Sequence, residues 1–189
     1  MELVSSPDII LTKNAIIKKA ISLLQTVQDH AQLYLKTLKK ELPKEAVEMS
    51  PKISKGENYK GLPYLVLDYP RVFDKKHVFA IRTMFWWGNF FSVTLHLSGR
   101  YKNLFEKNIA ASFVKLQNAG FSVCINNEEW EHHFEGDNYV ELSQIGEDNF
   151  QKDILKTRFI KLAKKIPLQA WENVPGLLVA DFKRIIELI

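Results

Sequence analysis

The sequence contains a single cysteine, Cys124, in 189 residues. One cysteine excludes an internal disulfide, and a chain without disulfides is typical of a reducing compartment. Cys124 lies in the apolar segment "FSVCI", where a buried and unreactive thiol is the usual outcome. We therefore expect a cytoplasmic protein whose stability comes from an ordinary hydrophobic core.

The short motifs that identify many enzymes are also missing. The sequence has no G-x-S-x-G elbow, no C-x-x-C pair, no G-x-G-x-x-G turn and no H-E-x-x-H pair. The segment "GENYKG" at 56–61 places glycines around a lysine, but it lacks the GK[ST] ending of a phosphate-binding loop. No motif in the sequence indicates a cofactor, and the sequence leaves open whether the chain is an enzyme.

Long hydrophobic runs are absent too. No apolar stretch approaches the roughly 20 residues that span a bilayer. The first residues, "MELVSSPDII", show no basic region followed by an apolar one. We therefore expect neither a membrane segment nor a secretory leader.

Positive charge is in slight excess but is not concentrated. The formal net charge is +4 and the isoelectric point is about 9.0. The lysines occur as short pairs among acidic residues, whereas nucleic-acid-binding proteins gather their cations into a stripe. We therefore do not expect nucleic acid as a partner.

The residues that are present predict a single α+β domain over 1–189. Apolar spacing predicts helices near 6–40, 103–118, 148–166 and 175–189, and strands at 62–69, 77–87, 90–98, 121–125, 130–134 and 139–145. Because consecutive strands follow one another without intervening helices, we expect a mostly antiparallel sheet of five to six strands, with a meander near 62–98. Residues 43–61 carry turn formers and predict a mobile loop.

Four residues are predicted to mark helix ends. Ser6 precedes Pro7 and suits an N-cap, and Pro175 suits the first turn of the last helix. Gly120 suits the position just beyond a helix C-terminus, where a left-handed backbone is common. Asn103, with Glu106 three residues later, predicts the start of the helix near 103–118.

The N-terminal helix is unusually long for a domain of this size. An unbroken helix over 6–40 would reach about 45 to 50 Å at ~1.5 Å per residue. Such a helix must bend, protrude, lie across a sheet or pair with a second chain. Its apolar spacing permits a homodimer through this helix, although the e and g positions, which flank a coiled-coil interface, do not carry complementary charges.

The segment "TMFWWGNFF", residues 83–91, predicts a hairpin with a two-residue turn at Gly88 and Asn89. This register pairs Trp87 with Phe90 and places alternate side chains of the hairpin on opposite faces of the sheet. One face is apolar apart from Arg82, which we expect to pair with a carboxylate such as Asp68. The other face mixes aromatic rings with hydroxyl groups and one imidazole.

The mixed face is the predicted ligand-binding site. Aromatic surface with a few polar groups is typical of small-molecule pockets, of protein interfaces and of faces buried by the protein's own helices. The sequence leaves these three alternatives open. A small-molecule ligand or a protein partner would contact the residues that line this face: Thr83, Phe85, Trp87, Phe90, Thr94 and His96.

The stretch "EEWEHHFEGD", residues 128–137, combines histidines with carboxylates, as metal sites and acid–base sites do. On a strand, His132 and His133 point to opposite faces and cannot readily bind one ion together. A site here would need His77 or His96 to arrive from another strand. The alternative function is therefore a hydrolytic or metal-assisted enzyme that uses His96, His132 or His133 with nearby carboxylates.

Overall fold

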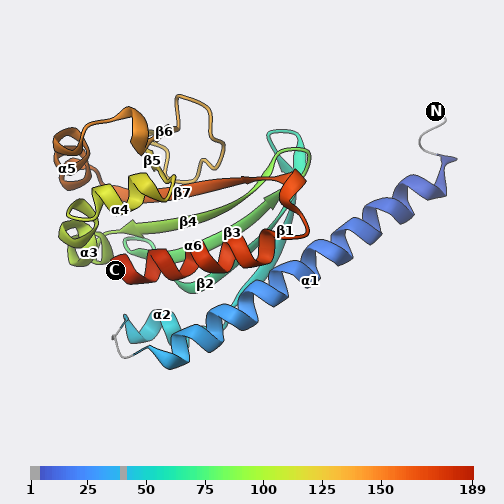
Figure 1. The fold of residues 1–189 in the computed structure, drawn as a ribbon. Helices are drawn as coiled ribbons and strands as arrows, with labels where there is room; N and C mark the ends of the chain where they lie inside the picture. The colour runs from blue at the N-terminus through green and yellow to red at the C-terminus, as the bar shows by residue number, and fades with distance from the viewer. Residues whose placement is uncertain (1–4, 39–41) are drawn as a thin grey trace.

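The computed structural model describes residues 5–38 and 42–189, and within them one antiparallel sheet is packed mainly against helices on one face (Figure 1). In this part of the chain the sheet has seven strands, in the order β1-β2-β3-β4-β7-β5-β6. The predicted α+β class with a mostly antiparallel sheet is confirmed. The sheet is one strand larger than the upper predicted number.

The first four strands form an uninterrupted meander, and the last strand in the chain inserts between β4 and β5. The strands are β1 Lys52–Tyr59, β2 Leu62–Phe73, β3 Val78–Trp86, β4 Phe90–Ser98, β5 Ser122–Cys124, β6 Tyr139–Glu141 and β7 Phe159–Pro167. The helices are α1 Pro7–Thr37, α2 Lys44–Glu48, α3 Arg100–Ala110, α4 Phe113–Asn118, α5 Glu147–Lys156 and α6 Val174–Leu188, with 3-10 turns η2 Leu142–Gln144 and η3 Leu168–Ala170.

The main hydrophobic core lies between the sheet and helices α1 and α6, which run side by side across one face (Figure 1). Alternate positions of the central strands point into it, because strand side chains have a period of two. An ion pair of 3.1 Å between Lys164 of β7 and Asp181 ties α6 to the sheet. The buried core residues of β3, β4 and α6 include Phe79, Ile81, Phe85, Phe91, Val93, Leu95, Leu97, Leu178, Phe182 and Ile185.

The predicted helix ends are confirmed at three positions. Ser6 is the N-cap residue of α1 and Pro7 begins that helix, and α6 carries its proline in the first turn. Gly120 follows α4 with φ +74, and the Phe121 amide donates to the Leu116 carbonyl across it. This pairing satisfies a carbonyl that the end of the helix would otherwise leave without a partner.

Helix α1 is continuous over 31 residues and is therefore about 46 Å long at ~1.5 Å per residue. Only its second half packs on the core, from Ala20 to Leu35, and its N-terminal half projects beyond the sheet (Figure 1). Ile10 and Leu11 on the projecting half are 57% and 62% exposed. Self-association through this helix stays a prediction, and Lys39 and Lys40 lie outside the described residues.

None of the described helices has the length and apolar composition needed to cross a membrane.

The prediction of a mobile loop at 43–61 is wrong. Residues Lys44–Glu48 form α2, and Lys52–Tyr59 form β1, which pairs antiparallel with β2. The sequence pattern did not reveal β1 because its side chains are mostly polar or half-buried at the edge of the sheet. Gly56 fits there because a Cβ atom at this position would lie 2.2 Å from the Tyr64 ring.

The prediction of one helix over 148–166 is also wrong, because α5 ends at Lys156 and β7 begins at Phe159. The apolar residues of β7 satisfy helical spacing and strand alternation equally well over so short a segment. Hydrogen bonding to β4 on one side and β5 on the other decides the outcome.

Two other elements differ from their predicted form. Residues 130–134 form no strand, and the predicted helix over 103–118 is divided into α3 and α4 around Ala111 and Ser112. Helix α3 begins at Arg100 rather than Asn103, because Gly99 with φ +56 turns the chain directly out of β4. The predicted apolar stripe of both helices, Phe105, Ile109, Phe113 and Leu116, is buried.

The predicted register of the aromatic hairpin is wrong by one position. Trp86, rather than Trp87, shares a pair with Phe90, so three residues connect the strands. Gly88 adopts φ +67, and the Asn89 amide donates to the Trp86 carbonyl at 3.1 Å. A shift of one residue moves every side chain of one strand to the other face relative to its partner strand.

Gly99 allows a direct test of the junction between β4 and α3. A Cβ atom there would lie 2.3 Å from the backbone oxygen of Lys76 and 2.1 Å from His77 Nδ1, in a backbone conformation with φ +56. We expect Gly99→Ala to lower the free energy of unfolding by about 3 kcal/mol. Urea denaturation measures the change.

The matched control is Gly136→Ala, since nothing lies within 4 Å of the added methyl group. Its effect should stay below about 0.5 kcal/mol. Equal effects of the two substitutions would show that the junction tolerates a side chain.

Candidate functional site

The sheet face opposite the main helices carries a line of polar side chains. The strand register places Asp68 beside Arg82, Arg82 beside Thr94, and His96 beside Lys161. Four of these side chains are buried, with Lys161 only 1% exposed. Buried polar residues in the middle of a sheet are costly unless they find partners. We call Asp68, Arg82, Thr94, His96 and Lys161 the polar strip.

Residues 125–138, the covering loop, lie over the polar strip and contain neither helix nor strand. The Trp130 ring lies 5.1 Å from the His96 ring, and the Phe134 ring lies 5.2 Å from that of Phe90. Two small apolar clusters flank the strip, around Trp86 and around Phe159. An irregular segment of this length inside a compact domain is often functional.

Arg82 and Asp68 form a bidentate ion pair, with distances of 2.7 and 2.9 Å. The predicted pairing of these two residues is confirmed. The Arg82 Nη1 atom also donates to His132 Nε2 of the covering loop at 3.0 Å. Burial, followed by the nearby Arg82 charge, holds the pKa of His132 well below its ordinary value of 6.5. His132 is therefore neutral and accepts this hydrogen bond at neutral pH.

His96 and Glu129 form the second contact between strip and loop, with 2.7 Å between His96 Nε2 and Glu129 Oε1. Burial lowers the pKa of His96 more than Glu129 raises it, and the hydrogen bond from His96 lowers the pKa of Glu129. A neutral imidazole beside an ionised carboxylate carries its proton on Nε2. The Nδ1 atom of His96 then keeps a lone pair that can accept a proton.

Tyr59 of β1 holds the middle of the covering loop. Its hydroxyl donates to the Glu131 carboxylate at 2.8 Å and accepts from the amides of His132 and His133 at 2.7 and 3.0 Å. Burial raises the pKa of Tyr59 to about 12, so the hydroxyl stays protonated at neutral pH. This one group satisfies two loop amides that have no secondary-structure partner.

Lys161 is the cation of the strip that lacks a carboxylate. Its Nζ atom donates to the backbone oxygen of Glu131 and lies 5.4 Å from the centre of the Tyr139 ring. Among the described residues, no carboxylate oxygen lies within 4.0 Å of it. Burial lowers the pKa of Lys161 from 10.5 to about 8. The amine is therefore deprotonated far more readily than a surface lysine.

Two buried side-chain polar atoms of the described residues lack a hydrogen bond of good geometry: Trp86 Nε1 and Tyr139 Oη, the second of which interacts with Thr94. Both belong to the face under the covering loop, since Trp86 pairs with Phe90 and Tyr139 pairs with Cys124. Burial raises the pKa of Tyr139 well above its ordinary value of 10, so its hydroxyl keeps its proton. Unpaired buried donors are uncommon in proteins. Each one needs an explanation, such as a catalytic role or a bound water or ion.

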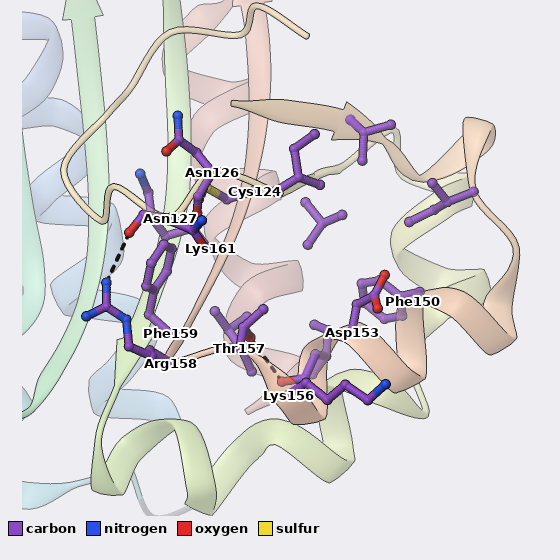
Figure 2. A pocket seen from close by; sticks show the side chains of 16 residues that line it. Cys124, Asn126, Asn127, Phe150, Asp153, Lys156, Thr157, Arg158, Phe159 and Lys161 are labelled. Atoms are coloured by element: carbon purple, nitrogen blue, oxygen red, sulfur yellow. Dashed lines mark hydrogen bonds between the residues drawn. The ribbon is translucent and has the colours of Figure 1, made fainter. Parts of the chain in front are cut away.

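A cavity of about 470 Å³ opens beside the polar strip, between strands β5 and β7 and helix α5 (Figure 2). Figure 2 shows Cys124, Asn126 and Lys161 on one wall and Phe150 and Asp153 of α5 on the other. Much of the lining is apolar, and Lys161 belongs both to the cavity wall and to the polar strip. The apolar lining side chains are Val123, Ile125, Val140, Ile145, Phe150, Ile154, Phe159 and Ile160.

Positive charge gathers around the cavity. Lys156 and Arg158 line it near its exposed side, and Asp153 is the only acidic lining residue within the described chain. The last turn of α5 also lies there and opposes an anion, but only by about 0.5 kcal/mol. The carbonyl of Asp153 in this turn already accepts from the Thr157 amide at 3.1 Å. Lys156 and Arg158 together outweigh the one carboxylate of Asp153, so the potential at this side of the cavity is positive.

One group of residues in the described chain has the arrangement to hold a metal ion: His133, Glu135 and Asp137 of the covering loop. A ligand atom from each lies within 4.8 Å of the others. His133 is buried, whereas the two carboxylates are largely exposed. His132 takes no part, since its Nε2 atom accepts from Arg82.

The six residues of the predicted ligand site are divided between the two faces of the sheet. Phe90, Thr94 and His96 lie under the covering loop, and Thr83 and Phe85 lie on the face of the main core. Trp87 lies in the turn and is half-buried against that core. A site in the 128–137 stretch was expected to need His77 or His96 from another strand. His96 of β4 does reach Glu129 in this stretch, whereas His77 accepts from the Arg100 amide instead.

Sequence reasoning missed the cavity and Lys161. The available signal was the segment "FIKLAKKIP", in which lysines 161 and 165 alternate with apolar residues as on a strand. Predicting a helix for this segment concealed that alternation.

Comparison with protein-family models, with curated proteins and with solved structures finds no match to this chain. The candidate site is therefore defined by its own geometry.

Replacing Lys161 by methionine removes the buried amine and keeps the length of the side chain. Because the pKa in the folded protein, about 8, lies below the ordinary 10.5, the protonated amine destabilises the fold below pH 8. This penalty disappears as the pH rises towards 10.5. We expect the stability of Lys161→Met relative to the unmodified protein to fall by about 2 kcal/mol between pH 7 and pH 10, as measured by urea unfolding.

The control is Lys165→Met on the same strand, where the lysine is exposed. Its effect on stability should not change between the two pH values. If the stability difference between Lys161→Met and the unmodified protein were the same at pH 7 and pH 10, burial would not disfavour the charged amine.

Proposed function

We propose that the protein binds a small amphipathic anion, a molecule with an apolar body and one acidic group, in the cavity between β5, β7 and α5. The observation that carries this proposal is the combination of an apolar cavity of about 470 Å³ with cations at its edge. Small-molecule sites are usually cavities of about 300–1,000 Å³ with mainly apolar walls and a few polar groups. The volume and the lining both agree with this pattern.

Arg158 and Lys156 are the groups proposed to receive the acidic end of the ligand. Arg158 donates one hydrogen bond, to the Asn127 carbonyl at 3.1 Å, and its guanidinium has further N–H groups for a carboxylate. The apolar body would lie against apolar lining residues such as Val123, Val140 and Ile154. Phe159 and Lys161 also line the cavity, and Lys161 belongs to the polar strip as well.

This proposal retains the prediction of a ligand-binding domain and moves the ligand to the edge of the sheet face that carries Thr94 and His96. It includes a cytoplasmic location, which the single free cysteine favours.

Octanoate and the uncharged 1-octanol test the proposal, because the two probes share an alkyl chain and differ in charge. We expect octanoate to bind about tenfold more tightly, as measured by calorimetric titration. Arg158→Gln should remove this preference while leaving binding of octanol. Val140→Phe, which adds bulk on the edge strand β6 and fills the cavity, should weaken binding of both probes.

Lys152→Gln is the matched control, since Lys152 is exposed on α5 and does not line the cavity. It should leave the affinity for octanoate unchanged. Equal affinities for octanoate and octanol would contradict recognition of an anion, and absence of binding by both would contradict the cavity as a ligand site.

A second candidate function is an acid–base reaction at His96, and the observation that favours it is the 2.7 Å contact with Glu129. A carboxylate that orients a neutral imidazole is the arrangement of a general base. The base would act through His96 Nδ1 on a water molecule attacking an ester or amide. In the metal-assisted version, His133 with Glu135 and Asp137 would hold an ion nearby.

Hydrolysis of 4-nitrophenyl octanoate checks this second candidate. We expect His96→Gln to lower kcat/KM by at least about 100-fold, which is the usual contribution of a general base. His30→Gln on the exposed side of α1 should have no effect. Assays with and without a chelator separate the metal-free version from the metal-assisted one. A rate that His96→Gln does not change would remove acid–base chemistry at this pair.

A further inference from the structure

Lys161 is one of the residues that line the cavity, and its primary amine is buried between the Glu131 carbonyl and the Tyr139 ring. The side chain is 1% exposed to solvent, and it lies beside Cys124 on the wall that faces α5 (Figure 2). Its hydrogen bond to the Glu131 carbonyl is made to a neutral acceptor. A buried amine that has no carboxylate partner gains little from being charged.

An uncharged lysine amine is a nucleophile for carbonyl carbon. Lysines that are removed from water in apolar surroundings commonly form imines with aldehydes and ketones, because only the neutral amine can attack. The lowered pKa of Lys161, about 8, means that a neutral amine is present in a useful fraction near neutral pH. A surface lysine at the same pH is almost entirely protonated.

Tyr139 supplies a hydrogen-bond donor close to the amine, although it is not one of the residues that line the cavity. Its ring centre lies 5.4 Å from Lys161 Nζ, and Thr94 is the hydrogen-bonding partner that acts on the pKa of its buried hydroxyl. Since its pKa is raised, this hydroxyl keeps its proton at neutral pH. A phenol beside an amine can donate a hydrogen bond to the carbonyl oxygen that the amine attacks.

We propose that Lys161 forms a reversible imine with an aldehyde or ketone bound in the cavity. This inference rests on the proposed function, and it narrows the ligand class to amphipathic oxo acids. The acidic group would meet Arg158 and the carbonyl group would meet Lys161, two lining residues that are three positions apart along the chain.

The covalent step is balanced without a further reactant. The amine nitrogen bonds to the carbonyl carbon as the C=O π bond breaks, and one N–H proton reaches the oxygen to give a carbinolamine. The nitrogen then forms a second bond to carbon as the C–O bond breaks. The oxygen leaves as water with the second N–H proton. Addition of water reverses both steps and releases the carbonyl compound.

8-Oxooctanoate tests the inference with the chain of residues 1–189, because it adds an aldehyde to the far end of octanoate. Borohydride reduces any imine to a stable amine, and peptide mass spectrometry locates it. We expect modification of Lys161 at least tenfold above that of any other lysine. Excess octanoate should suppress this modification, because octanoate competes for the cavity without forming an imine.

Two substitutions of Lys161 make the assignment specific. Lys161→Met and Lys161→Arg both remove the primary amine, while arginine keeps a positive charge in case the methionine variant is less well folded. Both variants should lose the modification. Lys165→Met on the same strand should keep it, and circular dichroism confirms that each variant is folded.

The outcomes separate the inference from the proposed function. Binding of octanoate with aldehyde adducts scattered over exposed lysines such as Lys156, or with no adduct at all, would overturn the imine and leave anion binding intact. An adduct confined to Lys161 without measurable octanoate binding would uphold the amine and contradict recognition of the acid. Absence of both would overturn both proposals.

Discussion

The pairing of Trp86 with Phe90 decides which side chains share a face of this sheet. It places Arg82, Thr94 and His96 on one side and leaves the other side to an almost entirely apolar core. A turn shorter by one residue would bring His96 and Thr94 into the layer beneath α6, where no carboxylate or loop carbonyl could satisfy them. The register of one hairpin therefore determines whether the protein has a polar strip at all.

A polar strip on a sheet needs cover that supplies hydrogen bonds, and a helix cannot do this through its backbone because its amides and carbonyls are paired internally. The covering loop can, because its backbone is not committed to a ladder. The Glu131 carbonyl serves Lys161, and the loop amides of His132 and His133 turn to Tyr59. The absence of regular structure over residues 125–138 is therefore the condition that allows the strip to be buried.

The sequence predicts the local elements well where side-chain chemistry is strong, as in the β-branched and aromatic strands β3 and β4. It also predicts the partner of Arg82, because a buried guanidinium requires a carboxylate and Asp68 lies on the neighbouring strand. It does not predict the turn at Gly88, since Gly-Asn suits turns of more than one length. That single ambiguity divided the predicted ligand site between two faces.

The prediction of a strand at 130–134 was wrong for an instructive reason. The alternation of Trp130, His132 and Phe134 is real, and all three side chains contact the sheet below them. The segment lies over the face of the sheet, begins in a turn at Trp130 and pairs with no strand. Periodicity reports the side that a chain buries, whereas strand pairing depends on contacts distant in sequence.

Lys161 connects the cavity to the middle of the covering loop, and this makes their free energies interdependent. Lys161 donates to the loop through the Glu131 carbonyl and lines the cavity with the same side chain. A ligand that engages the amine must compete with that hydrogen bond, so binding favours a loop displaced at Glu131. By reciprocity, contacts that hold the loop closed, such as those from Tyr59, weaken binding by the same free energy. The loop is therefore part of the site, although its aromatic residues lie outside the cavity.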